Sequence, residues 1–248
     1  SSIFLDIMSK PHIILSRPQL GENIGATARI MYNFGLQGLR LISPRDGWPN
    51  KKASTVSSGG GSLIDNAIIY TNLNDSIYDL NFVFSTTIRS RKYSKEIFNP
   101  EEGVKFAKKL IKEGNSVGIL FGSERAGLNK KEISSSNAII TIPVSEKFKS
   151  LNLSHAVGII SYEWFKNSKN DGVEKTDEID KFQYVKKIHI EKFVLKLKSQ
   201  LQKKGYFWPD DKVDSLNLNI DNLFHGLELT KPNLKTLFGI IKALDKDK

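Results

Sequence analysis

The chain contains no cysteine, which excludes disulfides, iron–sulfur clusters and zinc sites built on thiolates. Histidine is scarce as well, and none of the four copies, His12, His155, His189 and His225, is spaced from another as metal ligands are. No apolar run approaches the ~20 residues that a membrane-spanning helix needs. The first ten residues also lack the regions of a signal peptide. We therefore expect a cytoplasmic protein that uses no metal and no membrane.

Acidic residues are fewer than basic ones, 27 against 37, and the net charge is +10 at pH 7. The excess is +6 up to Phe165 and +4 from Lys166 onward, so both parts of the chain are basic. This excess of positive charge suits an extended polyanion as the partner, although a lysine-rich solvated surface would have the same net charge. The seven arginines all lie in the first half: Arg17, Arg29, Arg40, Arg45, Arg89, Arg91 and Arg125. The guanidinium group of arginine presents its N–H donors in a rigid fork, which suits contact with phosphate.

Strand-like and helix-like segments alternate over the first ~165 residues. The strand-like apolar runs are Pro11–Ser16, Leu39–Ser43, Phe82–Thr86, Val117–Phe121 and Ala138–Ile142. The helical patterns are Asn23–Phe34, Pro100–Glu113 and Leu151–Phe165, with a less regular one near Ser62–Asn66. This alternation predicts an α/β fold with a mostly parallel sheet and helices on both faces.

The C-terminal part differs in composition. Residues 166–180 are polar and rich in Asn, Lys, Asp and Gly, as linkers are. Residues 181–248 carry two apolar stripes at helical spacing, one from Ile188 to Leu201 and one from Leu234 to Leu244. We therefore predict a domain at residues 1–165, a linker at 166–180 and an appendage of two to four helices at 181–248. The aromatic cluster Tyr206-Phe207-Trp208 could stack on bases, but we expect it to pack in the core of that appendage.

A first candidate segment for chemistry runs from Arg17 to Arg29, between a strand and a helix. We expect Asn23 to cap that helix, and Arg29 to lean back over the small residues Gly25 and Ala26. The guanidinium and the free N–H groups of the first turn would then form an anion-binding corner. Alternatively, Gly25 and Ala26 only allow close packing of the helix on the sheet, and Arg29 is a surface charge.

Three further segments follow strands of the predicted sheet. Residues 85–91 combine hydroxyls with Arg89 and Arg91, either as a ligand contact or as an ordinary polar loop. Phe121–Leu128 holds two glycines that permit backbone approach to a ligand, and Ile142–Asn152 leads into a helix, where Ser150 or Asn152 could be a simple cap. Turns at the ends of parallel strands are typical walls of a small-molecule pocket.

Taken together, these segments resemble the SPOUT class of RNA methyltransferases, and within it the bacterial tRNA ribose 2′-O-methyltransferases of the TrmJ type. The motifs are Gly-Glu-Asn-Ile-Gly-Ala-Thr-Ala-Arg, Phe-Gly-Ser-Glu-Arg-Ala-Gly-Leu, and Ile-Pro followed by Ser-Leu-Asn-Leu. The resemblance covers Pro11 to about Phe165. It implies a deep trefoil knot in the C-terminal part of the α/β domain, a homodimer, and S-adenosylmethionine as the cofactor held by the knot loops.

The resemblance also assigns residues by position. The cofactor loops correspond to Thr86, Thr87, Ile88, Gly122, Ile142, Ser150 and Leu151. Arg29 matches the catalytic arginine of the family, and the supporting polar residues are Asn23, Glu124 and Asn152. Ser85 and Ile88 depart from the Gly and Ala that are frequent at their positions in the family.

The implied reaction is methyl transfer to a ribose 2′-hydroxyl of RNA, with nucleotide 32 of the tRNA anticodon loop, a cytidine or uridine, as the expected target. Arginine is effectively always protonated, so we expect Arg29 to position a phosphate and stabilise the developing alkoxide. RNA is expected on the loop Arg89–Lys95 and on the lysines of residues 186–204. Another tRNA site, ribosomal RNA and a non-catalytic RNA-binding module remain open. A Rossmann-type enzyme is disfavoured, because Gly21–Gly25 does not supply the pattern Gly-x-Gly-x-x-Gly.

Overall fold

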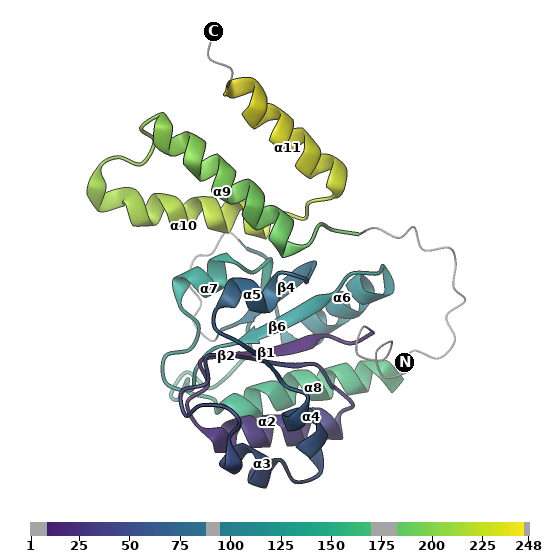
Figure 1. The fold of residues 1–248 in the computed structure, drawn as a ribbon. Helices are drawn as coiled ribbons and strands as arrows, with labels where there is room; N and C mark the ends of the chain where they lie inside the picture. The colour runs from purple at the N-terminus through teal and green to yellow at the C-terminus, as the bar shows by residue number, and fades with distance from the viewer. Residues whose placement is uncertain (1–8, 88–94, 170–182, 246–248) are drawn as a thin grey trace.

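The computed structural model describes residues 9–87, 95–169 and 183–245, and its centre is a seven-stranded sheet (Figure 1). All strand pairings are parallel, and the spatial order is β3-β2-β1-β6-β4-β7-β5. The strands are β1 (His12–Ser16), β2 (Leu39–Ile42), β3 (Ile68–Tyr70), β4 (Phe82–Thr86), β5 (Ile97–Phe98), β6 (Val117–Phe121) and β7 (Ala138–Ile140). The predicted parallel α/β sheet is confirmed.

The five strands that the sequence predicted are the buried ones. Every residue of β1, β2, β6 and β7 is buried, as are all but the last of β4. The two edge strands, β3 and β5, are short and exposed, with Ile68 51% and Ile97 50% accessible. Their apolar stretches, Ile68–Tyr70 and Ile97–Phe98, are only three and two residues long, and these strands were therefore not predicted.

Helices cover both faces of the sheet (Figure 1). The larger hydrophobic cluster joins one face to α2 (Gly21–Asn33), α3 (Lys51–Ser57), α4 (Gly61–Asp65), α6 (Pro100–Lys112) and α8 (Leu153–Lys169). The short helices α5 (Leu73–Ile77) and α7 (Lys130–Ser134) lie on the other side. The expected helices are confirmed with shifts of a few residues at their ends, whereas α3, α5 and α7 are too short to show a period.

Helix starts explain several of these boundaries. Asn99 and Glu102 form a capping box at the start of α6, and Pro100 occupies the first turn. Asn129 and Glu132 form a second capping box at α7. Two reciprocal hydrogen bonds satisfy otherwise free N–H groups there, so a helix as short as α7 can start at a fixed residue.

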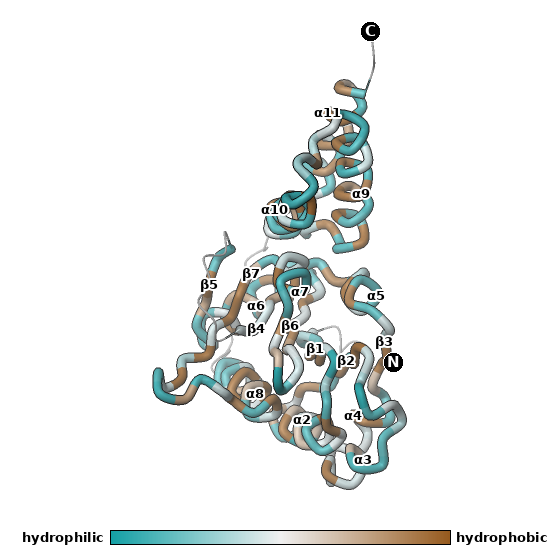
Figure 2. Tube along the Cα trace, turned by 90° about the vertical axis from the view of Figure 1, so that its left-hand side faces the viewer, coloured by the Kyte–Doolittle hydropathy of each residue, from teal (hydrophilic) through white to brown (hydrophobic). Residues whose placement is uncertain are grey.

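Three helices follow the α/β part of the chain: α9 (Lys187–Lys203), α10 (Val213–Gly226) and α11 (Lys231–Leu244), with a 3-10 turn η2 (Asp210–Lys212) before α10. They share a small hydrophobic cluster around Phe193, and their hydrophobic and hydrophilic stretches alternate along the helices (Figure 2). The expected apolar stripes form this cluster except at their ends: Ile188 is not part of it, and Leu244 is 74% exposed because α11 extends beyond its neighbours. The helix α8 continues to Lys169, past the predicted start of the linker, and residues 170–182 lie outside the described ranges.

The aromatic cluster after α9 is divided between core and surface. The helix ends at Lys203, and Gly205 adopts a positive φ of 70° that turns the chain. Phe207 packs against the cluster of the three helices, as expected. Trp208, however, is 76% exposed and Tyr206 46%. The prediction that the whole cluster is core is therefore wrong for these two rings.

Candidate active site

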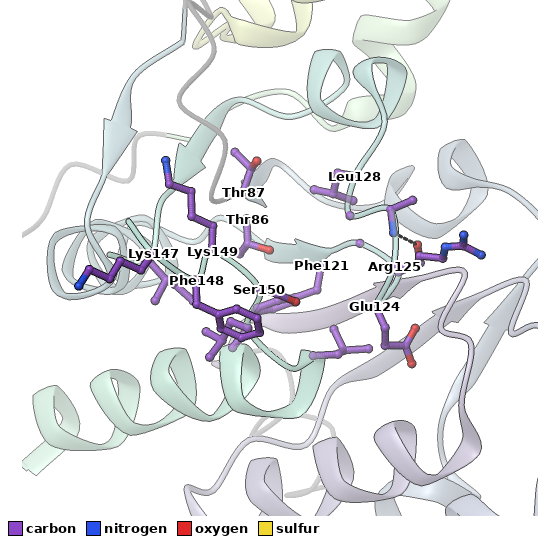
Figure 3. Close-up of a pocket in the computed structure, with 18 residues that line it drawn as sticks. Thr86, Thr87, Phe121, Glu124, Arg125, Leu128, Lys147, Phe148, Lys149 and Ser150 are labelled. Atoms are coloured by element: carbon purple, nitrogen blue, oxygen red, sulfur yellow. Dashed lines mark hydrogen bonds between the residues drawn. The ribbon is translucent and has the colours of Figure 1, made fainter. Parts of the chain in front are cut away.

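A cavity of about 610 Å³ opens at the carboxyl ends of β4, β6 and β7. Its walls come from the ends of these strands, from the turn after β6, and from the segment that leads into α8 (Figure 3). In parallel α/β sheets, ligands bind in the crevice outside the carboxyl ends of the strands. The cavity also lies within the usual size range of small-molecule sites, roughly 300–1,000 Å³.

The structure brings nearly all the predicted cofactor residues to this one cavity. The lining includes Thr86, Thr87, Gly122, Ile142, Ser150 and Leu151. Ile88, the remaining one, lies outside the described residues. Thr86 donates its hydroxyl to the carbonyl of Leu120 at 2.9 Å, so this side chain also ties β4 to β6. The cavity therefore has hydroxyl groups on strand ends that are held in place by the sheet.

Gly122 has a structural reason for lacking a side chain. A Cβ there would lie 2.1 Å from the carbonyl carbon of Gly127 and 2.2 Å from the amide nitrogen of Leu128, both backbone atoms. The turn closes on itself through Gly127 N–H, which donates to Ser123 O at 2.9 Å, and Gly127 adopts a φ of 66°. We expected Gly122 to admit a ligand, but its missing side chain makes room for the protein's own turn.

The turn after β6 is bonded to the start of α2 through Glu124. This carboxylate accepts the backbone N–H groups of Gln19 at 2.7 Å and Leu20 at 3.1 Å, and the amide of Asn23 at 2.9 Å. Asn152 in turn donates to Asn23 Oδ1 at 3.1 Å. The three residues assigned as supporting groups thus form one hydrogen-bonded chain beside the cavity.

The expected capping role of Asn23 is wrong. The helix α2 begins at Gly21, and its N-cap residue is Leu20. The apolar side chain of Leu20 makes no capping hydrogen bond. Asn23 lies inside the first turn and uses its amide to reach Glu124 and Asn152. The sequence placed the helix start too late because Gly21 is a poor helix former. A Cβ at Gly21 would lie 2.2 Å from Asn50 Oδ1, so the Asn50 side chain, which caps α3, would have to move to admit it.

Arg29 lies apart from the cavity of its own chain. Its side chain is exposed, it is not among the lining residues, and no hydrogen bond or ion pair joins its guanidinium to another described residue. Gly25 does not serve as a lane for it, because the glycine lies against α3, where a Cβ would be 2.4 Å from Ala53 O. The alternative interpretation, that Gly25 allows close packing, is therefore right, but the packing partner is the helix α3 and not the sheet.

A buried acidic contact on α7 was missed by the sequence analysis. Glu132, 5% exposed, accepts hydrogen bonds from the Ser16 hydroxyl and from Arg17 Nη2, the latter at 3.0 Å. Arg17 has a φ of 50°, which is uncommon for a residue with a side chain. The contact holds the exit of β1, where the segment toward Asn23 begins. The capping-box pattern Asn129-x-x-Glu132 was the available sequence sign for this helix.

Charged side chains also surround the mouth of the cavity. Lys147 and Lys149 lie on one side and Arg125 on the other, and between them is the ring of Phe148, which is 72% exposed (Figure 3). These four residues are here called the rim. Lys147, Phe148 and Lys149 were not predicted as site residues, because their pattern has no periodicity and resembles an ordinary polar loop.

Two lysines expected to face RNA are instead buried where α10 meets α7. Lys95 Nζ donates to the carbonyls of Ser134 at 3.0 Å and Ser136 at 2.6 Å. Burial lowers the pKa of Lys95 to about 7, with Asp221 opposing the shift. Lys187 donates to His225 O at 3.0 Å, and burial lowers its pKa well below the usual value. Arg89, Arg91 and Lys92 of the expected basic loop lie outside the described residues.

Residues 10–162 match the SpoU rRNA Methylase family. The chain belongs to this family. Like the other SpoU proteins it is a methyltransferase, and the matched stretch spans β1 to α8 with the whole cavity. The resemblance inferred from the three motifs is thereby confirmed.

Relatives of this SpoU methyltransferase extend the match into the C-terminal helices. Its structure is similar to the crystal structure of TrmJ from Z. mobilis ZM4, with a TM-score of 0.85. The two sequences are 36% identical, and the match covers 96% of this chain and 100% of the TrmJ chain. It is 30% identical over 238 residues to the tRNA (cytidine/uridine-2′-O-)-methyltransferase TrmJ of Photorhabdus laumondii, covering 94% of this chain and 96% of that protein. The tRNA (cytidine-2′-O-)-methyltransferase TrmJ of Methanocaldococcus jannaschii is 34% identical to this chain over 154 residues. That match covers 61% of this chain and 65% of the relative.

No group of three or more His, Asp or Glu side chains is arranged to hold a metal ion among residues 9–87, 95–169 and 183–245. Over the same part of the chain, no helix is long and apolar enough to cross a membrane.

Proposed function

We propose that this SpoU methyltransferase transfers a methyl group from S-adenosylmethionine to a ribose 2′-hydroxyl of tRNA. The observation that carries the proposal is the cavity itself. Segments far apart in the sequence, at Thr86, Gly122, Ile142 and Ser150, meet at the ends of three adjacent strands. Relatives that share this domain and the C-terminal helices are named for 2′-O-methylation of cytidine or uridine in tRNA.

The cavity is suited to S-adenosylmethionine in size and chemistry. Apolar walls from Phe121, Ile142 and Leu151 provide surface for the adenine ring, and the hydroxyls of Thr87 and Ser150 can bond polar groups. When bound, the cofactor supplies an electrophilic methyl group on a sulfonium. The segment from β7 to α8 passes next to these strand ends, and we include in the proposal that it is threaded as a trefoil knot, as the SPOUT resemblance implies.

Arg29 supports a homodimeric arrangement. It is exposed on α2, outside the cavity of its own chain. It lies six residues, or about 9 Å along the helix axis, beyond Asn23. We infer that a second copy places its Arg29 at the cavity of the first, next to the amides of Asn23 and Asn152. The site would then be complete only in the dimer.

In this arrangement the roles of the residues follow from their chemistry. The guanidinium of Arg29 stays charged and donates hydrogen bonds in a fixed fork, so it positions a phosphate and stabilises negative charge that develops on the 2′-oxygen. Asn152 and Asn23 hold the start of α8 against the start of α2. Most of the rate enhancement would come from alignment of the reacting atoms, because no described group is placed as a strong base at the cavity.

The target that we propose is nucleotide 32 of the tRNA anticodon loop, with cytidine or uridine accepted, in the cytoplasm. The names of the full-length relatives support the substrate class and the two bases. The basic charge of both parts of the chain supports a nucleic-acid partner. The competing candidates are another tRNA nucleotide, ribosomal RNA, and RNA binding without catalysis.

Two experiments test this proposal. Calorimetric titration should give saturable binding of S-adenosylmethionine at one site per chain and no binding of NAD, and the reverse result would contradict the cofactor assignment. The dimer is tested with two inactive variants, Arg29→Ala and the cavity variant Leu151→Lys, co-expressed with different tags. If Arg29 acts across the dimer, the purified mixed dimer recovers activity at one of its two sites. A mixed dimer without activity would show that Arg29 serves the cavity of its own chain.

A further inference from the structure

The cavity is divided into an inner part without charge and a charged mouth. Its inner lining includes Phe121 and Ile142, which are 1% and 5% exposed. The one carboxylate in the lining, Glu124, is occupied by two backbone N–H groups and Asn23. All three positive charges of the lining, on Arg125, Lys147 and Lys149, belong to the exposed rim (Figure 3). The two parts therefore suit ligands of different charge.

The backbone N–H groups of Lys147 and Phe148 donate to Ser145, but no side chain of the rim has a hydrogen-bond or ion-pair partner within the described chain. No ion pair joins the ammonium groups of Lys147 and Lys149 or the guanidinium of Arg125 to another described residue. The ring of Phe148 makes no contact with another described aromatic ring, and 72% of the residue is exposed. An aromatic ring that is largely exposed between two lysines, beside a cavity and without a partner ring among the described residues, is not explained by the stability of the fold.

We propose that Phe148 is a substrate-binding residue whose ring stacks on a base of the RNA, while Lys147, Lys149 and Arg125 contact phosphates on either side. The inference rests on the proposed function and names the edge of the cavity that the RNA touches. Stacking on aromatic side chains is a common way to hold an unpaired base, and lysine and arginine at the same edge neutralise the backbone. The cofactor is assigned to the uncharged interior, which Phe148 does not enclose.

The test compares three variants of Phe148 in the full-length protein. Phe148→Ala removes the ring, Phe148→Leu keeps an apolar side chain without a π-face, and Phe148→Trp restores a stacking surface. The first two should weaken binding of unmodified tRNA by about 5- to 150-fold, the range of one lost base stack, and Phe148→Trp should bind as the unaltered protein does. Fluorescence anisotropy with labelled tRNA measures this, and circular dichroism checks folding.

A second measurement separates the RNA from the cofactor. Binding of S-adenosylmethionine to each variant should stay within about twofold, because the ring is not part of the inner wall. Weaker cofactor binding in Phe148→Ala, with tRNA binding unchanged, would assign the ring to the cofactor and overturn the inference. Equal tRNA binding by Phe148→Leu and the unaltered protein would overturn the stacking role.

The phosphate contacts have a test of their own. The double variant Lys147→Gln and Lys149→Gln should reduce the slope of log Kd for tRNA against log salt by about 1.4 to 1.8, since each phosphate contact contributes about 0.7 to 0.9. The matched control is Lys231→Gln together with Lys235→Gln, two exposed lysines on α11. An unchanged slope in the rim variant, or an equal change in the control, contradicts the rim as the contact surface.

Failure of the inference and failure of the proposed function give different results. An unaltered protein that binds tRNA but not S-adenosylmethionine refutes the proposed reaction, while the comparison of Phe148 variants still reads directly on tRNA binding. An unaltered protein that does not bind tRNA overturns both.

Discussion

The side chain of Asn23 donates from Nδ2 to Oε1 of Glu124 at 2.9 Å. The two residues lie about a hundred positions apart, one in the first turn of α2 and the other in the turn that closes the cavity. The same carboxylate accepts the backbone N–H groups of Gln19 and Leu20. A negative charge at this end of the helix is favourable, because the helix dipole is positive there. The cavity wall and the helix that carries Arg29 are therefore held together by one side chain.

Substitution of Glu124 should weaken this link. Glu124→Gln keeps the size of the side chain but replaces one acceptor oxygen with an NH2 group that faces backbone donors. We expect a loss of about 1–2 kcal/mol in the free energy of unfolding, together with lower methylation, measured by urea denaturation and by methyl incorporation. The control is Glu101→Gln, an exposed residue paired with Lys105 on α6, which should change stability by less than about 0.5 kcal/mol. Equal effects of both substitutions would contradict the role of Glu124 in joining the turn after β6 to the start of α2.

Gly122 should not tolerate a methyl group. In Gly122→Ala the new Cβ would overlap backbone atoms of Gly127 and Leu128, which cannot move without opening the turn. We expect destabilisation by about 1–3 kcal/mol and weaker cofactor binding. Gly59→Ala is the matched control, because no heavy atom lies within 4 Å of the added Cβ. Thermal unfolding measures the loss of stability, and calorimetry measures cofactor binding. An unaltered Tm in Gly122→Ala would show that the turn is more adaptable than the structure indicates.

Arg29 should be needed for the reaction and not for cofactor binding. Arg29→Ala should reduce the single-turnover rate by at least about 100-fold, the usual effect of losing a charge-stabilising donor, with the affinity for S-adenosylmethionine unchanged. Arg45→Ala is the comparison, since Arg45 is exposed and pairs with Asp46. Loss of cofactor binding in Arg29→Ala, or full activity, would remove Arg29 from the mechanism.

The contact between α10 and α7 should make stability depend on pH. Burial lowers the pKa of Lys95 to about 7 in the folded chain, whereas an unfolded lysine has a pKa of about 10.4. Between these values the unfolded state binds more protons, so the free energy of unfolding should rise as the pH increases from about 7 to 10. Lys187, whose pKa burial lowers as well, should add to this rise, and Glu191 and Asp221 oppose the shifts in these lysines.

Lys95→Met isolates the part of this effect that belongs to Lys95. The variant should show a smaller rise between pH 7 and 10 in urea denaturation followed by circular dichroism. Its carbonyl partners, Ser134 O and Ser136 O, lose a donor, which costs about 1–3 kcal/mol against the gain from removing a buried charge. Lys235→Met, on the exposed side of α11, should leave the pH profile unchanged. A profile for Lys95→Met that parallels the unaltered protein would contradict the assignment.

The fold was predictable where buried strands are continuous apolar runs, as in Val117–Phe121, and where a helix begins with a clear cap, as at Asn99. It was not predictable at β3 and β5, because these edge strands are only three and two residues long and partly exposed. Asn23 shows a second kind of limit. The residue fits a helix cap, but a carboxylate far along the chain competes for its amide, and only the folded structure shows that contact.

The candidate site was predictable to a similar degree. Motif positions placed Thr86, Gly122, Ile142 and Ser150 correctly around one cavity. Lys95 was expected on the surface because lysine usually lies there. Its burial depends on α10, which packs over it from the distant C-terminal part of the chain. The role of Phe148 could not be read from the sequence, because exposure of a single aromatic ring is decided by its neighbours in space.

The most direct test of the central claim is to locate the methyl group itself. The purified protein is incubated with unmodified tRNA and S-adenosylmethionine that carries a deuterated methyl group, and the products are digested and mapped by mass spectrometry. We predict label on the ribose of cytidine or uridine at position 32, none when the Arg29→Ala variant is used, and none on any base. Label on a base, or no transfer to any RNA while the cofactor binds, would contradict the account.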